Sequence, residues 1–173
     1  VTDDQYLLIE QKSTKQTGPT SDQQLEAAGR EIVRVIRHDA VKLATATVLV
    51  GNHREGALAL AIGRILANQG VSVAAVFLAS IGDPVNDHVA FQKRLFMQAG
   101  GKVIDESELA AVDLIVDGVV GRDASGKIAA AGTKLATLVA AVVKNVPVAS
   151  IETPFPATLT SSWKWLFAIG FPK

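Results

Sequence analysis

Residues 47–57 read TVLVGNHREGA, and this stretch decides the expected fold. Its first four residues are aliphatic or β-branched, and they predict a short strand that ends at Gly51. Residues 56–68 then show the apolar spacing of a helix, which Gly70 closes. A strand that passes through a short loop directly into a helix is the first half of a βαβ unit.

The same alternation continues along the chain. Residues 71–79 and 113–120 are continuous apolar runs, which are typical of strands buried on both faces. Shorter strands are expected at 102–105, 147–152 and 165–170, and further helices at 1–11, 22–37, 86–98 and 129–145. Ser21, with Gln24 three residues on, is the expected N-cap of the helix at 22–37. The sequence therefore predicts one α/β domain over residues 1–173, a Rossmann-like three-layer αβα sandwich with a mainly parallel sheet.

The composition excludes several classes of protein. The 173 residues include 17 Lys and Arg, 17 Asp and Glu, and no Cys. The balanced charge argues against strong non-specific binding of nucleic acid, and the lack of Cys excludes disulfides and thiolate nucleophiles. The apolar runs are too short to span a membrane, so we expect no membrane partner. Because the chain begins with Val, we expect it to be the C-terminal part of a longer protein.

The loop after the first strand holds five candidate ligand residues: Gly51, Asn52, His53, Arg54 and Gly56. In open α/β sheets, ligands bind beyond the carboxyl ends of the strands, near the point where the strand order reverses. The loop spacing is neither G-x-G-x-x-G nor that of a P-loop. The acid expected at the end of the second strand to bind a ribose is also missing, because Asp83 lies too far along the chain. These features disfavour ordinary dinucleotide binding and favour a structural turn.

Two acidic residues lie at or near the same expected edge. Asp117 falls inside an apolar strand, where a carboxylate needs a cation, hydrogen-bond donors or protonation. It is therefore either a ligand contact or a capped structural acid. Glu152 ends a later strand, and a solvated strand end is its simpler interpretation. His53 has no partner in the sequence pattern that would complete a metal site or a catalytic triad.

Three arginines, Arg30, Arg34 and Arg37, are spaced so that they share one side of the helix expected at 22–37. A solvated helix face explains this spacing, and so does contact with the phosphates of RNA. The sequence leaves both interpretations open.

Four motifs together resemble the YjeF N-terminal domain family over nearly the whole chain. They read LEAAGR at 25–30, GNHREGA at 51–57, VDLIVDG at 112–118 and VASIETP at 148–154. This family includes the NAD(P)HX epimerases, whose motifs read E-N-A-G, G-N-N-G-G-D-G, V-D-A-I-F-G-T-G and D-I-P-S-G. The resemblance implies the Rossmann-like fold of that family.

The departures from the epimerase motifs concern the site. The resemblance implies that, in the epimerases, an Asn of the loop and an acid of the strand hold a potassium ion. In this chain His53 replaces that Asn, and Asp117 matches that acid. Gly56 stands where the loop has its acid, residues 54–55 replace inner glycines, and Phe155 replaces the Ser of the last motif. Because positioning and charge stabilisation depend on such groups, we expect no catalytic residue, no metal and no epimerase activity.

The loop and the closing segment WLFAIGFP at 165–172 resemble a non-enzymatic branch, the YjeF-N domain of enhancer of mRNA-decapping proteins. That resemblance implies a homodimeric scaffold that cross-bridges messenger ribonucleoprotein in cytoplasmic processing bodies. Its other partners, the decapping machinery and a DEAD-box helicase, bind the rest of such a chain. The pocket is then degenerate, with no cofactor or a weakly bound nucleotide or NAD-like ligand. Its residues are Gly51, Asn52, His53, Arg54, Gly56, Asp117 and Glu152.

Two alternatives remain. One is a divergent NAD(P)HX epimerase or related nucleotide-metabolite isomerase that depends on Asp117, with His53 or Glu152 as its base. The other is direct RNA binding through the three arginines, shared across a dimer, with an affinity that falls steeply with salt.

Overall fold

The computed structural model describes residues 12, 18–39, 42–78, 86–121, 137, 139–141, 146–154 and 163–168. The helix expected at 1–11 and most of the helix expected at 129–145 lie outside these residues. None of the helices in the described part of the chain has the length and apolar character needed to cross a membrane.

The sheet has six parallel strands in the order β3-β2-β1-β4-β5-β6. The strands are β1 Thr45–Val50, β2 Ser72–Phe77, β3 Lys102–Val103, β4 Leu114–Gly118, β5 Val148–Ile151 and β6 Trp163–Phe167. This order is the doubly wound arrangement, and it confirms the predicted α/β, Rossmann-like fold. It also makes β1 and β4 the neighbours at which the strand order reverses, with Val50 opposite Gly118.

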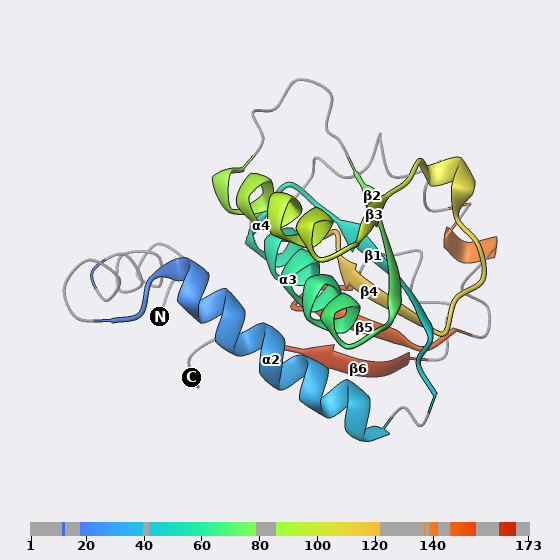
Figure 1. Cartoon of the computed structure of the whole chain (residues 1–173), viewed down its shortest axis with the longest axis horizontal. Coiled ribbons are helices and arrows are strands. Elements are labelled where there is room, and N and C mark those ends of the chain that lie inside the picture. The colour runs from blue at the N-terminus through green and yellow to red at the C-terminus, as the bar shows by residue number, and fades with distance from the viewer. Residues whose placement is uncertain are drawn as a thin grey trace.

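Three helices cover one face of the sheet (Figure 1). They are α2 Ser21–Asp39, α3 Arg54–Asn68 and α4 Asp87–Gln98, and a short 3-10 helix, η1, spans Glu106–Glu108. On the opposite face, Val139 lies in a separate core cluster with Leu49 and Ile115. The predicted three layers are therefore present.

Some boundaries differ from the expectation. Thr20 rather than Ser21 caps α2, since its hydroxyl accepts a bond from the Gln23 N–H and its own N–H donates to the Gln23 side chain. Both hydroxyl residues have a Gln three positions later, so the pattern does not separate them. The last strand starts at Trp163, two residues before the expected position. β3 covers only the first two of the four residues expected at 102–105, and it pairs with β2 at the edge of the sheet.

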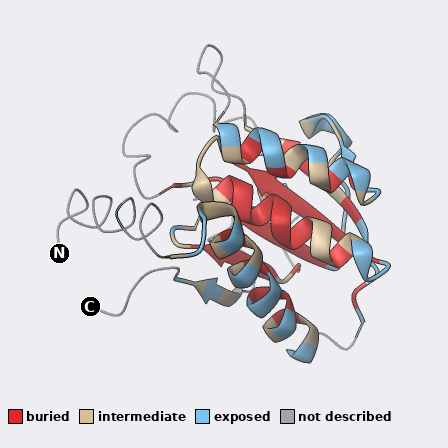
Figure 2. Cartoon of the chain, turned by 60° about the vertical axis from the view of Figure 1, so that its left-hand side comes forward, coloured by how far each residue is buried: buried red, intermediate tan, exposed pale blue. Residues whose placement is uncertain are grey.

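Helix α3 is the most deeply buried helix described, and it lies between α2 and α4 (Figure 2). Small residues allow it to approach the sheet closely. A Cβ placed on Gly63 would lie 2.7 Å from a methyl carbon of Val48 on β1. This close packing fixes the N-terminal end of α3 just beyond the carboxyl end of β1, where the candidate loop lies.

Candidate functional site at the β1–β4 switch point

Glycines hold the loop after β1 directly against the end of β4. The Gly51 N–H donates a 3.0 Å hydrogen bond to the Gly118 carbonyl. A Cβ on Gly51 would lie 2.2 Å from the Val119 carbonyl oxygen, and a Cβ on Gly56 would lie 1.9 Å from the Gly51 carbonyl oxygen. No side chain fits at such distances. The predicted ligand residues Gly51 and Gly56 therefore pack backbone against backbone.

Two polar residues of the loop reach toward neighbouring helices. The side-chain oxygen of Asn52 accepts a 2.7 Å bond from the backbone N–H of Asn86. Asn86 is the N-cap of α4, because its own side chain accepts from the first N–H groups of that helix. The Arg54 guanidinium donates a 2.9 Å bond to the side chain of Gln24 on α2. Asn52 and Arg54 thus connect the loop to the N-terminal ends of α4 and α2.

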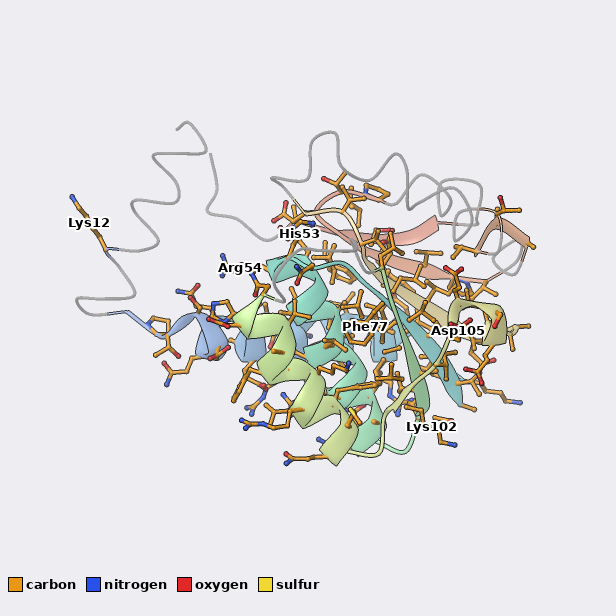
Figure 3. The ribbon with its side chains drawn as sticks, turned by 90° about the horizontal axis from the view of Figure 1, so that it is seen from above. Lys12, His53, Arg54, Phe77, Lys102 and Asp105 are labelled. Carbon is orange, nitrogen blue, oxygen red and sulfur yellow. The ribbon has the colours of Figure 1, made fainter. Side chains whose placement is uncertain are left out.

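His53 and Glu55 lie on the side of the loop that meets β4. His53 is the N-cap residue of α3, and its side chain makes no capping hydrogen bond. A Cβ on Gly121 would lie 2.8 Å from His53 Cγ and 2.9 Å from Glu55 Oε2. Both side chains therefore pack on Gly121, just past the end of β4. Figure 3 labels His53 and Arg54 at the N-terminal end of α3.

The loop motif predicts no role for Glu55, which stands only as a replacement of an inner glycine. The structure places its side chain on Gly121, as it does that of His53. The signal that could have found it is its position two residues after His53, at a strand-to-helix loop that ends beside the switch point.

Asp117 is fully buried and lies on the other face of the sheet. Gly118 meets Ala59 of α3, so the alternation of β4 directs Asp117 away from α3, toward the face of Ile115. The Val119 N–H donates to Asp117 Oδ1 at 3.2 Å, and the Ser150 hydroxyl donates to Oδ2 at 3.1 Å. The structure therefore shows a carboxylate capped by donors.

The epimerase resemblance assigns Asp117 to a potassium site. In this structure its carboxylate accepts hydrogen bonds from the Val119 N–H and the Ser150 hydroxyl. Among the residues that the structure describes, no group of three His, Asp or Glu side chains could hold a metal ion.

Glu152 follows β5 in a left-handed backbone conformation, with φ at 60°. For a residue with a side chain, this conformation costs about 1–3 kcal/mol. Two contacts fix the segment: the Glu152 N–H donates a 2.8 Å bond to the Phe167 carbonyl, and Thr153 bridges to Val120. The strained residue therefore lies at the same edge of the sheet as the loop, one strand beyond β4.

The three predicted arginines come together on one surface. Arg30, Arg34 and Arg37 line a groove of about 430 Å³ between α2 and α3, with Ile65 in its wall. Arg34 pairs with Glu31 at 2.9 Å in an exposed salt bridge, and Arg37 donates to the Gln69 side chain at 3.0 Å. Contact of this groove with RNA stays a prediction.

Residues 21–159 match the model of the family described as YjeF-related protein N-terminus. The chain belongs to this family. Over 129 residues, 69% of the chain, it is 33% identical to the bifunctional NAD(P)H-hydrate repair enzyme Nnr of Mycobacterium leprae (strain TN). The chain spans 25% of the length of that relative.

Solved structures support the fold. The crystal structure of the yeast protein ynu0 matches with a TM-score of 0.70 at 16% identity, over 89% of this chain and 70% of that one. The crystal structure of eIF2B delta from Chaetomium thermophilum matches with a TM-score of 0.43 at 16% identity, over 81% of this chain and 54% of that one. The second similarity is too low to carry an argument.

The expectation that this YjeF-N chain is not an enzyme is wrong. The curated relative is a repair enzyme, so the comparison associates the chain with a catalytic family. The error came from judging activity by the loop motif, although a changed loop can supply different chemical groups. The link to decapping enhancers is not shown. The homodimer, the decapping and helicase partners and the location in processing bodies stay predictions.

Proposed function

We propose that this chain is an enzyme that acts on hydrated NAD(P)H and interconverts the two epimers of the hydrate. One observation carries the proposal: the match to an NAD(P)H-hydrate repair enzyme. The match extends over 69% of the chain. The family match over residues 21–159 includes the loop after β1 and the end of β4, which are in contact at the switch point. Ligands of doubly wound sheets bind at that point.

We place the dinucleotide at the carboxyl edge of the sheet, beside the contact between the loop after β1 and the end of β4. The first N–H groups of a helix have no partner within the helix, and they favour anions. The N-terminal end of α3 lies at this edge, so we place the diphosphate there. The hydrated ring then lies toward Gly121 and the side chains that pack on it.

The experiment is an NMR titration of the ¹⁵N-labelled chain with each purified epimer of hydrated NADH and NADPH. We expect the amide signals of residues 51–57 and 118–121 to shift in a saturable manner. Unmodified NADH is the control, and we expect it to cause smaller shifts. No shifts with either epimer, or shifts confined to the groove between α2 and α3, would overturn the proposal.

A further inference from the structure

We infer that the groove between α2 and α3, together with an adjoining hollow between α2 and α4, forms one trough that binds a short peptide segment of another protein. The segment that fits carries apolar side chains at one end and acidic side chains at the other. The inference goes beyond the proposed function, because none of the residues that line the trough belongs to the loop after β1 or to the end of β4.

The two hollows adjoin because Arg30 lines both of them. The groove that contains the three arginines has a volume of about 430 Å³. The second hollow is also about 430 Å³, and its apolar wall consists of Ala27 on α2 and of Phe91 and Leu95 on α4. Figure 2 shows the exposed surfaces of α2 and α4 on either side of the buried helix α3. The trough therefore has a basic end and an apolar end, with Arg30 between them.

The basic end carries positive charge that the protein does not neutralise. Within the described part of the chain, the exposed guanidinium of Arg30 makes no ion pair. Arg34 pairs with Glu31 in an exposed salt bridge, and such pairs contribute little to stability. Arg37 donates to the side-chain oxygen of Gln69, which is neutral. Carboxylates of a ligand can therefore form charge-assisted hydrogen bonds at this end.

The apolar end presents hydrophobic surface to solvent. Phe91 is 37% exposed, and Leu95 is half-buried beside it. The Arg94 guanidinium lies over the Phe91 ring, 5.3 Å from its centroid, and adds a positive charge at the margin of this surface. An aliphatic side chain of a ligand would cover the remaining apolar area, and burial of such area is favourable.

Two acidic residues of the trough favour a peptide over RNA. Asp22 and Glu26 line the apolar end. Glu26 pairs with Arg64, and Asp22 contacts His88 at 3.1 Å. RNA carries a phosphate on every nucleotide, so a strand that follows the trough must pass these carboxylates. A peptide can confine its acidic residues to the basic end, and the zero net charge of the chain provides no general attraction for nucleic acid.

The spacing of the arginines suits an extended segment. Alternate side chains of an extended chain lie about 6.6 Å apart on one side, and Arg30 and Arg34 are separated by about 6 Å along the axis of α2. From Arg30 to Arg37 the helix rises about 10 Å, which about three to four extended residues span. Two acidic side chains at alternate positions can therefore face two of the arginines at once.

The test measures the fluorescence polarisation of labelled synthetic peptides as the purified chain is added. The probe is an acetylated and amidated peptide with leucines at one end and glutamates at alternate positions of the other end, made in both chain orders. We expect saturable binding of one order. The control peptide has glutamine in place of each glutamate, and we expect it to bind about tenfold more weakly or less.

Two pairs of variants locate the binding. We expect Arg30→Gln to weaken binding about three- to tenfold, and Lys102→Gln, which removes an exposed cation from β3, to leave it nearly unchanged. We expect Phe91→Ala to weaken it about threefold or more, and Met97→Ala to leave it nearly unchanged, because Met97 is exposed on the same helix but does not line the trough. All four side chains are exposed, so these substitutions leave the fold intact.

Absence of saturable binding of both peptide orders overturns the inference, and so do equal losses for Arg30→Gln and Lys102→Gln. Single-stranded oligouridylate is measured at the same salt concentration, and tighter binding of this RNA than of the peptide assigns the trough to nucleic acid. Sedimentation velocity tests a second copy of the chain: a dimer that Arg30→Gln or Phe91→Ala dissociates overturns the peptide as occupant. None of these results depends on turnover of hydrated NAD(P)H, so the proposed function is tested separately.

Discussion

The Ser150 hydroxyl donates a 3.1 Å hydrogen bond to Asp117 Oδ2, between residues paired in register on β5 and β4. The Val119 N–H donates to the other carboxylate oxygen. These two donors supply hydrogen bonds to the fully buried carboxylate of Asp117. Asp117 lies on β4, one of the two strands at the switch point. The two hydrogen bonds explain how the sheet holds Asp117 on the face away from α3.

Ser150→Ala should destabilise the fold. Removal of the hydroxyl leaves a buried carboxylate with one donor fewer, which costs about 1–3 kcal/mol of unfolding free energy. Urea denaturation measures this loss. Ser107→Ala is the matched control, because Ser107 donates to Asp105 at an exposed position and its loss should cost much less. Equal effects for the two variants would contradict the structural role of Asp117.

Gly56→Ala should be poorly tolerated. Its Cβ would lie 1.9 Å from the Gly51 carbonyl oxygen, so the loop after β1 must move. We expect a loss of about 1–3 kcal/mol in unfolding free energy and a lower kcat. Gly29→Ala on α2 is the control, since the nearest atom to its Cβ would be the flexible end of Ile65 at 3.2 Å, and Ala61 and Leu58 would lie at an ordinary contact distance of 3.7 Å. A neutral Gly56→Ala would contradict the close packing of the loop.

Asp113 should make stability depend on pH. The N–H groups of Ala44 and Thr45 and the Thr45 hydroxyl donate to its carboxylate, and they lower the pKa of Asp113. The resulting stabilisation is present above the unfolded-state pKa of about 3.9 and is lost as the pH falls through the lowered folded-state pKa.

Asp113→Asn should therefore be less stable than the wild type at neutral pH, by about 1 kcal/mol given the exposure of the group. The difference should shrink as the pH falls through the lowered folded-state pKa, because the carboxyl group is then protonated in both the folded and the unfolded protein. Denaturation curves at neutral and at acid pH measure it. A difference that persists in acid would show that the carboxylate charge is not responsible.

Asn52 and Asn86 should contribute separately to the stability of the N-terminal end of α4. Asn86→Ala removes the side-chain cap of α4 and should cost about 0.5–2 kcal/mol. Asn52→Ala removes the acceptor for the Asn86 backbone N–H and should cost about 1 kcal/mol. Because Asn86→Ala keeps that backbone N–H, a double-mutant cycle should give nearly additive losses, and a coupling energy well above about 0.5 kcal/mol would contradict this assignment of the bond.

The fold could be predicted because the central strands are largely apolar and because α3 and α4 follow β1 and β2 in the chain. The loop at 51–57 was placed correctly at the end of β1 for this reason. The side of the sheet on which Asp117 lies could not be predicted, because a strand buried on both faces does not show which face α3 covers. The packing of Glu55 on Gly121 could not be predicted either, because the two residues are distant in sequence and only the fold brings them together.

The measurement that tests the central claim most directly is the rate of interconversion of the two epimers of hydrated NADH or NADPH, followed by NMR with purified chain. The account predicts interconversion well above the spontaneous rate. A folded chain that leaves the spontaneous rate unchanged would contradict it.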